Sequence, residues 1–144
     1  MIKIAEKEDI IILSIMLSNM YQELFGADAS GNIDDYINTI VTHFNDCRDT
    51  IYIDNLGRGF FIVRDETEAI APNLHRYNGI RVYIHEEHRK GRLLAEFYAR
   101  LFEDFPNGDI LGQTEIDSEH IAVLDKRHTR IANVYKLSRK TTKR

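Results

Sequence analysis

The chain has a single cysteine, no long apolar run and no excess of positive charge, and each of these features excludes a class of protein. Its one cysteine, Cys47, cannot form an internal disulfide or a zinc site of several cysteines, and it fits a reducing compartment. No run of about 18 apolar residues is present, so no membrane-spanning helix is predicted. The residues from Met1 to Glu6 lack the basic-then-apolar order of a secretory signal. We therefore expect a soluble protein of the cytoplasm that has no membrane partner.

The charge balance is slightly acidic. The 144 residues include 19 Lys and Arg against 23 Asp and Glu, which gives a formal net charge of −4. Such a chain has no overall attraction for nucleic acid, so any phosphate binding must depend on a local basic cluster. One cluster is Arg89, Lys90 and Arg92, and the other is at the C-terminus. Residues 139–144 contain no apolar side chain and are expected to form a flexible, solvated tail behind one domain of residues 1–138.

Hydrophobic spacing predicts a series of strands and helices with no internal repeat. Strands are expected where apolar residues follow a two-residue period, and helices where they recur at three- and four-residue steps. Asp9 stands where it can cap the first helix, and Pro106 to Gly108 end the third. The segment Asp65–Asn78 has a weak pattern and is expected to be a mobile or substrate-facing loop. In chain order, the predicted elements are a strand at 2–5, helices at 10–24 and 33–44, strands at 51–53, 59–63 and 80–84, a helix at 93–105, a strand at 110–116, a short helix at 117–124 and a strand at 131–137.

This order, β-α-α-β-β-β-α-β-α-β, is typical of a single domain of the α/β (α+β) class. The strands at 51–53 and 59–63 are separated by the turn residues of a hairpin, so they are expected to be antiparallel. The strands at 80–84 and 110–116 are joined by a helix instead. Because strand, crossover helix and strand follow one another, these two strands should be parallel neighbours.

The turn between residues 85 and 92 is the clearest candidate for a binding site. It leads from a strand into a helix and contains Gly91 between basic residues. Backbone N–H groups at a helix start can bind a phosphate, and a glycine gives the backbone room to come close. Arg89, Lys90 and Arg92 would add charge-assisted contacts, the arginines in a forked geometry. The alternative interpretation is a solvated basic turn that only links the strand to the helix.

The order of elements resembles that of the GNAT superfamily of acyl-CoA-dependent N-acyltransferases over nearly the whole chain. Residues 87–94 look like a shortened form of the acyl-CoA turn of that family, without its second small residue, and residues 123–137 are similar to its last helix, turn and strand. The short format and degenerate turn also resemble those of small GNAT-like proteins carried by bacteriophages. The resemblance implies a mixed, largely antiparallel sheet of about six strands with helices on both faces, and acetyl-CoA as co-substrate. The implied acyl-CoA-binding residues are Val82, Tyr83, Ile84, Arg89, Lys90, Gly91, Arg92 and Leu93.

The resemblance further implies transfer of an acetyl group from acetyl-CoA to a primary amine by direct attack. Such a reaction requires a base for the ammonium group, and Glu115 and Asp117 fall on one face of the predicted strand 110–116. His85, at the exit of the strand before the turn, is a third candidate. The carboxylates could instead form a solvent-facing strand side, with Asp117 as a helix cap. Many family members have a tyrosine in the last helix that protonates the departing thiolate. Leu124 is the best match to that position, and leucine cannot donate a proton.

The sequence also bears on other possible functions and on the partners of the chain. Without the tyrosine, the chain could be a non-catalytic GNAT-like binding or structural protein, such as a phage virion or host-interaction component. Nucleic-acid binding through the basic tail and the turn at residues 89–92 is disfavoured by the negative net charge. No metal site is predicted, because His85 and His88 match no known closed ligand set. The acceptor stays open among polyamines, aminoglycosides, amino acids, lysine side chains and protein N-termini, and an edge strand in so small a sheet is compatible with a homodimer.

Overall fold

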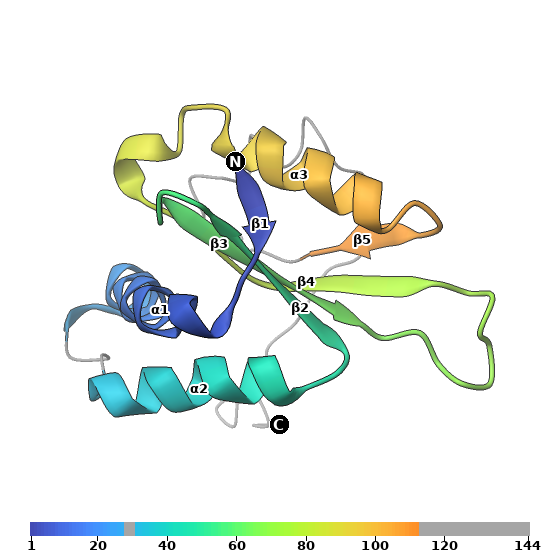
Figure 1. The fold of residues 1–144 in the computed structure, drawn as a ribbon, viewed down its shortest axis with the longest axis horizontal. Helices are drawn as coiled ribbons and strands as arrows, with labels where there is room; N and C mark the ends of the chain where they lie inside the picture. The colour runs from blue at the N-terminus through green and yellow to red at the C-terminus, as the bar shows by residue number, and fades with distance from the viewer. Residues whose placement is uncertain (28–30, 113–144) are drawn as a thin grey trace, which may run out of the picture. The chain divides into compact units, whose positions relative to one another are not determined.

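The computed structural model describes residues 1–27 and 31–112, and a mixed sheet runs through this part of the chain (Figure 1). Its five strands lie in the order β1-β2-β3-β4-β5. The first three neighbouring pairs are antiparallel, whereas β4 and β5 are parallel, as the crossover helix between them predicts. The strands are β1 (Ile2–Ile4), β2 (Asp49–Asp54), β3 (Gly59–Asp65), β4 (Arg76–Ile84) and β5 (Asp109–Leu111).

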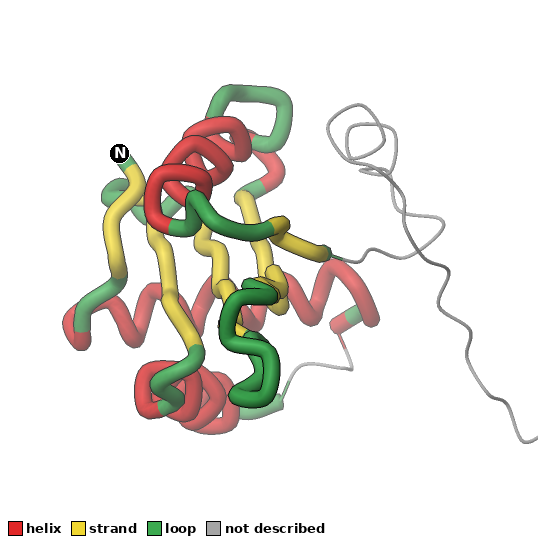
Figure 2. Tube along the Cα trace, turned by 90° about the vertical axis from the view of Figure 1, so that its right-hand side faces the viewer, coloured by secondary structure: helices red, strands yellow, loops and turns green. Residues whose placement is uncertain are grey.

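Helices cover both faces of this sheet, as expected. Figure 2 shows the strands between two layers of helix. One face packs against α1 (Ile10–Phe25) and α2 (Ile33–Asn45), and the other packs against α3 (Leu93–Asp104). Two 3-10 turns, η1 (Lys7–Asp9) and η3 (Glu86–His88), precede α1 and α3. The mixed, largely antiparallel architecture predicted from the sequence is therefore confirmed.

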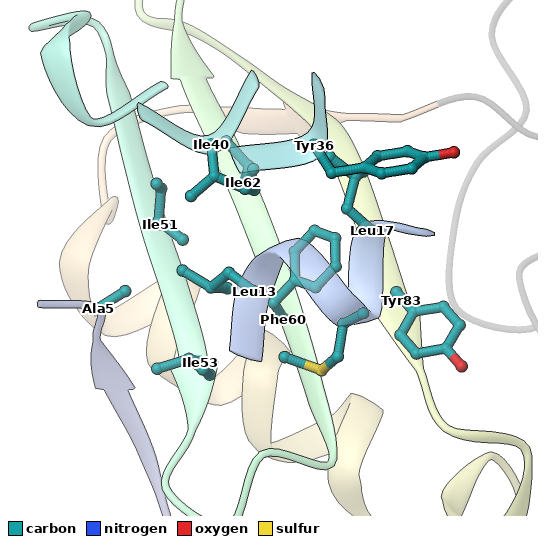
Figure 3. Packing of buried hydrophobic residues seen from close by; sticks show 11 residues of the cluster. Ala5, Leu13, Leu17, Tyr36, Ile40, Ile51, Ile53, Phe60, Ile62 and Tyr83 are labelled. Carbon is teal, nitrogen blue, oxygen red and sulfur yellow. The ribbon is translucent and has the colours of Figure 1, made fainter. Parts of the chain in front are cut away.

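The core on the α1 and α2 face is made of side chains that the helical and strand periods place together (Figure 3). Leu13, Leu17 and Ile40 from the helices meet Phe60 and Ile62 from the central strand β3, and all five are fully buried. Truncating one buried leucine of this kind costs about 2–5 kcal/mol, because a cavity remains. This core fixes the distance between α1 and the middle of the sheet.

The core on the α3 face is smaller and more aromatic. Phe97 and Leu101 of α3 are fully buried against Phe61 and Tyr52. The Tyr52 hydroxyl donates a hydrogen bond of 2.7 Å to Oδ2 of Asp104, which satisfies its polar end in the core. Helix α3 is thereby held against the sheet directly after the predicted phosphate-binding turn.

Two expectations differ from the structure. Asp9 is the N-cap residue of α1, as predicted, but its side chain makes no capping hydrogen bond to α1, because its carboxylate instead accepts the N–H of Glu6 at 2.8 Å. Strand β4 begins at Arg76, four residues earlier than the apolar run predicts, because pairing with β3 extends to Tyr77 opposite Asp65. The predicted elements after residue 112, the sixth strand among them, and the basic tail lie outside the described residues.

Candidate active site

Strand β4 contains a β-bulge next to its pairing with β5. Ile62 of β3 pairs with Arg81, whereas the next residue, Val63, pairs with Gly79, so β4 has one extra residue, Ile80. Strand β5 pairs with β4 only along 76–78, before the bulge. Among the described residues, no strand pairs with this side of β4 after the bulge. We name residues 79–84 of β4 the open edge, because no strand within residues 1–27 and 31–112 pairs with that side of them.

The backbones of Val82 and Ile84 face the open edge. The N–H of His85 donates to the Arg58 carbonyl oxygen at 2.9 Å, on the β3 side. Since backbone groups alternate in direction along an antiparallel strand, Tyr83 also bonds toward β3, and Val82 and Ile84 direct their N–H and C=O groups the other way. An extended ligand with amide groups can pair with these as an added strand would.

Helix α3 begins immediately after the basic turn, residues 89–92, and has no side-chain cap. Its N-cap residue is Arg92, which makes no capping hydrogen bond. N–H groups in the first turn of a helix have no acceptor within the helix, and the helix dipole adds partial positive charge there. Lys90 and Arg92 are exposed beside them, whereas the Leu93 side chain is buried in the α3 core and leaves only its backbone for binding.

Gly91 leaves space at this helix start. An added Cβ at Gly91 would meet only the carbonyl oxygen of His88, at the ordinary contact distance of 3.5 Å. The folded chain therefore has no steric need for glycine at this position. The space that a side chain would occupy is available for a ligand to approach the backbone.

The third basic side chain of the turn, Arg89, has partners within the protein. Its Nε donates a hydrogen bond of 2.7 Å to the carbonyl oxygen of Ile84, and its Nη2 forms an ion pair with the carboxylate of Glu23 in α1. The guanidinium carbon lies 5.7 Å from the centre of the Tyr83 ring. Arg89 thus connects the basic turn to α1 and to the end of β4.

A pocket of about 430 Å³ lies between the C-terminal half of α1 and the residues that follow β4. Three of its lining residues, Glu23, Glu86 and Glu87, are acidic, which favours a cationic ligand. The sequence identified the β4 side of this pocket through His85 and Tyr83, but it marked no residue of α1 as part of the site. The remaining lining residues are Asn19, Gln22 and Ala27.

The Tyr83 hydroxyl reaches this pocket between two titratable groups. It donates to Oε1 of Glu23 at 3.3 Å and lies 3.3 Å from Nδ1 of His85. Burial raises the pKa of Tyr83, and the Glu23 carboxylate raises it further, while Arg89 opposes them. Because one hydroxyl proton cannot serve two acceptors, we assign the His85 proton to Nδ1, donating to Tyr83. Nε2 of neutral His85 is then able to accept a proton.

A buried chain of side chains holds β4 beside its bulge. Arg81 donates from Nε to Nε2 of His43 at 3.0 Å and from Nη1 to the Tyr21 hydroxyl at 3.1 Å. His43 therefore has its own proton on Nδ1, 2.8 Å from Asp49, whose carboxylate also accepts two bonds from Arg64. Burial raises the pKa of Asp49, but the hydrogen bonds from Arg64 and His43 outweigh burial and lower it. The network ties β4 to both α1 and α2.

The structure brings several predicted site residues together at one end of β4. Val82, Tyr83 and Ile84 lie on β4, His85 follows it, and the basic turn leads into α3. Glu115 and Asp117 lie outside the described residues.

Within residues 1–27 and 31–112, no group of three or more His, Cys, Asp or Glu side chains is arranged to hold a metal ion. No helix in the same ranges is both long and apolar enough to cross a membrane.

Comparison with known proteins gives matches at the level of structure. No family model and no curated protein sequence matches the chain. The fold is similar to that of a possible acetyltransferase from Clostridium difficile 630, with a TM-score of 0.74, 15% identity and coverage of 96% of both chains. It is also similar to a ribosomal-protein-alanine N-acetyltransferase from Brucella melitensis biovar Abortus 2308 (TM-score 0.68, 17% identity, 96% of both chains). A GNAT family acetyltransferase from Staphylococcus aureus subsp. aureus USA300_TCH1516 gives a TM-score of 0.65 at 14% identity, again over 96% of both chains.

These likenesses define the class of fold. The chain has the fold of the GNAT superfamily, as its order of elements predicted. The identities are low, so they carry information on fold and not on substrate.

Proposed function

We propose that the protein is an acyl-CoA-dependent N-acyltransferase that transfers an acetyl group from acetyl-CoA to a primary amine. The observation that carries this proposal is the bulge at Ile80, after which the backbones of Val82 and Ile84 face away from β3, followed by a helix start without a side-chain cap in a GNAT fold. An extended ligand with amides at one end and a pyrophosphate at the other matches both features.

In the proposed complex, the two parts of acyl-CoA have different partners. The amide groups of the pantetheine arm pair with the outward N–H and C=O groups along the open edge. The pyrophosphate accepts hydrogen bonds from the first N–H groups of α3, at the space beside Gly91. Lys90 and Arg92 neutralise its charge from the exposed side of the turn.

Acetyl transfer then requires a free amine and stabilisation of the oxyanion. We assign the base to Nε2 of His85, which takes a proton from the substrate ammonium so that the nitrogen lone pair can attack the thioester carbonyl. The N–H of Val82, on the open edge, donates to the oxygen that becomes negative. The attacking nitrogen has two protons after it bonds to the carbonyl carbon, and it loses one of them to solvent. The carbon–sulfur bond then breaks, and the thiolate leaves and gains a proton from water. Glu115 and Asp117 remain proposed alternatives to His85.

The acceptor in this proposal is a cationic amine that binds in the pocket between α1 and the exit of β4. The carboxylates of Glu23, Glu86 and Glu87 attract an ammonium group and hold it beside His85. This favours acceptors with more than one positive charge, such as polyamines or aminoglycosides, over neutral amino acids.

The test is ligand-induced stabilisation followed by turnover. Acetyl-CoA at about 100 times its Kd should stabilise the fold by roughly 2.7 kcal/mol, which corresponds to a rise in Tm of about 10 °C. Gly91→Asp should abolish the rise, because it puts bulk and negative charge where the pyrophosphate binds. Asn73→Asp, which adds the same charge in the exposed loop between β3 and β4, should retain it. No rise with wild-type protein at millimolar acetyl-CoA would contradict the proposal.

A non-catalytic GNAT-like protein is the second candidate, and the leucine at position 124 favours it. Turnover separates the two functions. Release of free CoA in the presence of spermidine or an aminoglycoside, lost in His85→Ala, supports the enzyme. Binding of acetyl-CoA without turnover on a broad panel of amines supports the second candidate.

A further inference from the structure

Arg89 contacts two groups that have separate roles in the proposed function. Its Nη2 pairs with Glu23, an acidic residue of the acceptor pocket, and its Nε bonds to the carbonyl oxygen of Ile84, on the open edge. The Arg89 side chain is 19% exposed and that of Glu23 is 40% exposed, so the pair lies at the surface of the pocket, where it can separate at moderate cost.

The same arginine belongs to the basic turn in which the pyrophosphate is proposed to bind. Arg89 uses one edge of its guanidinium group for these contacts, with Nε on Ile84 and Nη2 on Glu23, so a phosphate that binds this edge in bidentate form must displace both of them. An anionic ligand at the start of α3 therefore competes with Glu23 for Arg89. The amide chain of acyl-CoA also competes with Arg89 for the Ile84 carbonyl.

We infer that Arg89 exchanges Glu23 for the pyrophosphate of acyl-CoA, and that this exchange frees Glu23 to bind the ammonium group of the acceptor. The inference rests on the proposed function. Without acyl-CoA, the Arg89 guanidinium neutralises Glu23, and the pocket has less attraction for a cation. With acyl-CoA bound, Glu23 retains its bond from the Tyr83 hydroxyl but has lost its cation, and it accepts the substrate ammonium in place of Arg89.

This exchange couples the two substrates. Since the coupling free energy is the same from either side, acyl-CoA should tighten the binding of the amine by the factor by which the amine tightens the binding of acyl-CoA. Glu23 is then a specificity-determining residue that favours cationic acceptors only after acyl-CoA has bound.

A double-mutant cycle on acetyl-CoA affinity tests the exchange, with Kd measured by isothermal titration calorimetry at fixed salt. Glu23→Gln removes the competitor for Arg89 and should tighten acetyl-CoA binding by about threefold. Arg89→Gln should weaken binding by about tenfold. In the Arg89→Gln background, Glu23→Gln should have no effect on the Kd. Glu23→Asp, which keeps the charge on a shorter side chain, should give a value between those of wild type and Glu23→Gln.

The control for a simple charge effect is Glu87→Gln, which removes a carboxylate from the same pocket. In the described residues Glu87 makes no ion pair with Arg89. Equal tightening by Glu23→Gln and Glu87→Gln, or full tightening by Glu23→Gln in the Arg89→Gln background, would overturn the inference and leave the proposed function standing. Failure of the wild-type protein to bind acetyl-CoA would overturn the proposed function, and the inference with it.

A second arm of the experiment uses spermidine as the cationic probe. Spermidine should bind wild-type protein about fivefold more tightly in the presence of saturating CoA than in its absence. The difference should disappear in Glu23→Gln. Equal spermidine affinity with and without CoA in the wild type would contradict the exchange.

Discussion

Two polar turns of this protein each contain arginine, and they use it in opposite ways. In the hairpin turn, residues 54–58, the Arg58 fork holds the fully buried carboxylate of Asp54 through Nε at 2.6 Å and Nη2 at 2.9 Å. The same carboxylate accepts backbone N–H groups and the terminal ammonium group of Met1. The hairpin turn therefore satisfies its charges internally.

The basic turn, by contrast, presents its charge to the outside. Lys90 and Arg92 are exposed and have no ion pair among the described residues, and α3 starts without a side-chain cap. Only Arg89 has a carboxylate partner, and that partner lies in the neighbouring pocket. The hairpin turn uses its charges within the fold, whereas the charges of the basic turn are the ones that we propose for ligand binding. Substitutions in the first should cost stability, and substitutions in the second should cost binding.

The largest expected effect is in the hairpin turn. Asp54→Asn keeps the shape of the side chain but removes the charge that Arg58 and the Met1 ammonium group share, so it should lower the free energy of unfolding by about 3 kcal/mol. Urea denaturation at neutral pH measures this loss. Glu68→Gln, which removes an exposed carboxylate in the loop between β3 and β4, is the control and should change stability little. If Asp54→Asn lowered the free energy of unfolding by less than about 1 kcal/mol, the difference between the two turns would be contradicted, because the hairpin turn would then not depend on its internal charges.

The second-largest effect is expected on acetyl-CoA binding by the basic turn. The double variant Lys90→Gln/Arg92→Gln should unfold at the wild-type urea concentration but bind acetyl-CoA about 100-fold more weakly, since each lost charge-assisted bond is worth about tenfold. Lys7→Gln/Arg76→Gln removes two exposed charges elsewhere and should keep the affinity within about twofold. Equal losses in the two double variants would mean that overall charge, and not the turn, governs binding.

The pH dependence of the free energy of unfolding also tests whether the hairpin turn depends on its internal charges. Burial raises the pKa of Asp54, but its hydrogen bonds with Arg58 outweigh burial and lower it from 3.8 to about 2. Because the folded-state pKa is depressed, the stabilisation is present above the unfolded pKa and is lost as the pH falls through the folded one. Between about pH 4 and pH 2, wild type should lose about 2 kcal/mol more than Asp54→Asn. Parallel stability curves for the two proteins would contradict this.

The smallest effect on stability is expected at Gly91. Gly91→Ala adds a Cβ that meets only the His88 carbonyl oxygen at 3.5 Å, so the free energy of unfolding should change by less than about 0.5 kcal/mol. The added methyl group lies where the ligand approaches, and acetyl-CoA affinity should fall by several-fold. A clear loss of stability would show that the glycine serves the fold instead of the ligand.

Much of the fold could be predicted from the sequence because its signals are local. The apolar stripes of α1, α2 and α3 and the hairpin of β2 and β3 follow from residue spacing, and the parallel pairing of β4 with β5 follows from the helix between them. The early start of β4 could not be predicted. Residues from Arg76 to Gly79 are not typical of a strand, and they pair because the preceding strand lies beside them.

In the candidate site, too, the features with a local signal in the sequence could be predicted, and those that depend on tertiary packing could not. The basic turn and His85 were found because a strand, a glycine and a helix start are adjacent in the chain. Glu23 was missed, because its contact with Arg89 joins residues 66 positions apart, and only the packing of α1 on the sheet brings them together. The bulge at Ile80 was missed too, since register depends on both strands and neither has a local mark of it.

The most direct test of the central claim, that the open edge of β4 and the start of α3 bind acyl-CoA, is a crystal structure of the protein with acetyl-CoA. The account predicts the pyrophosphate within hydrogen-bond distance of the N–H groups in the first turn of α3, from Leu93 onward, and the pantetheine arm alongside Val82 and Ile84. Acetyl-CoA bound at another surface, with this edge and this helix start empty, would contradict it.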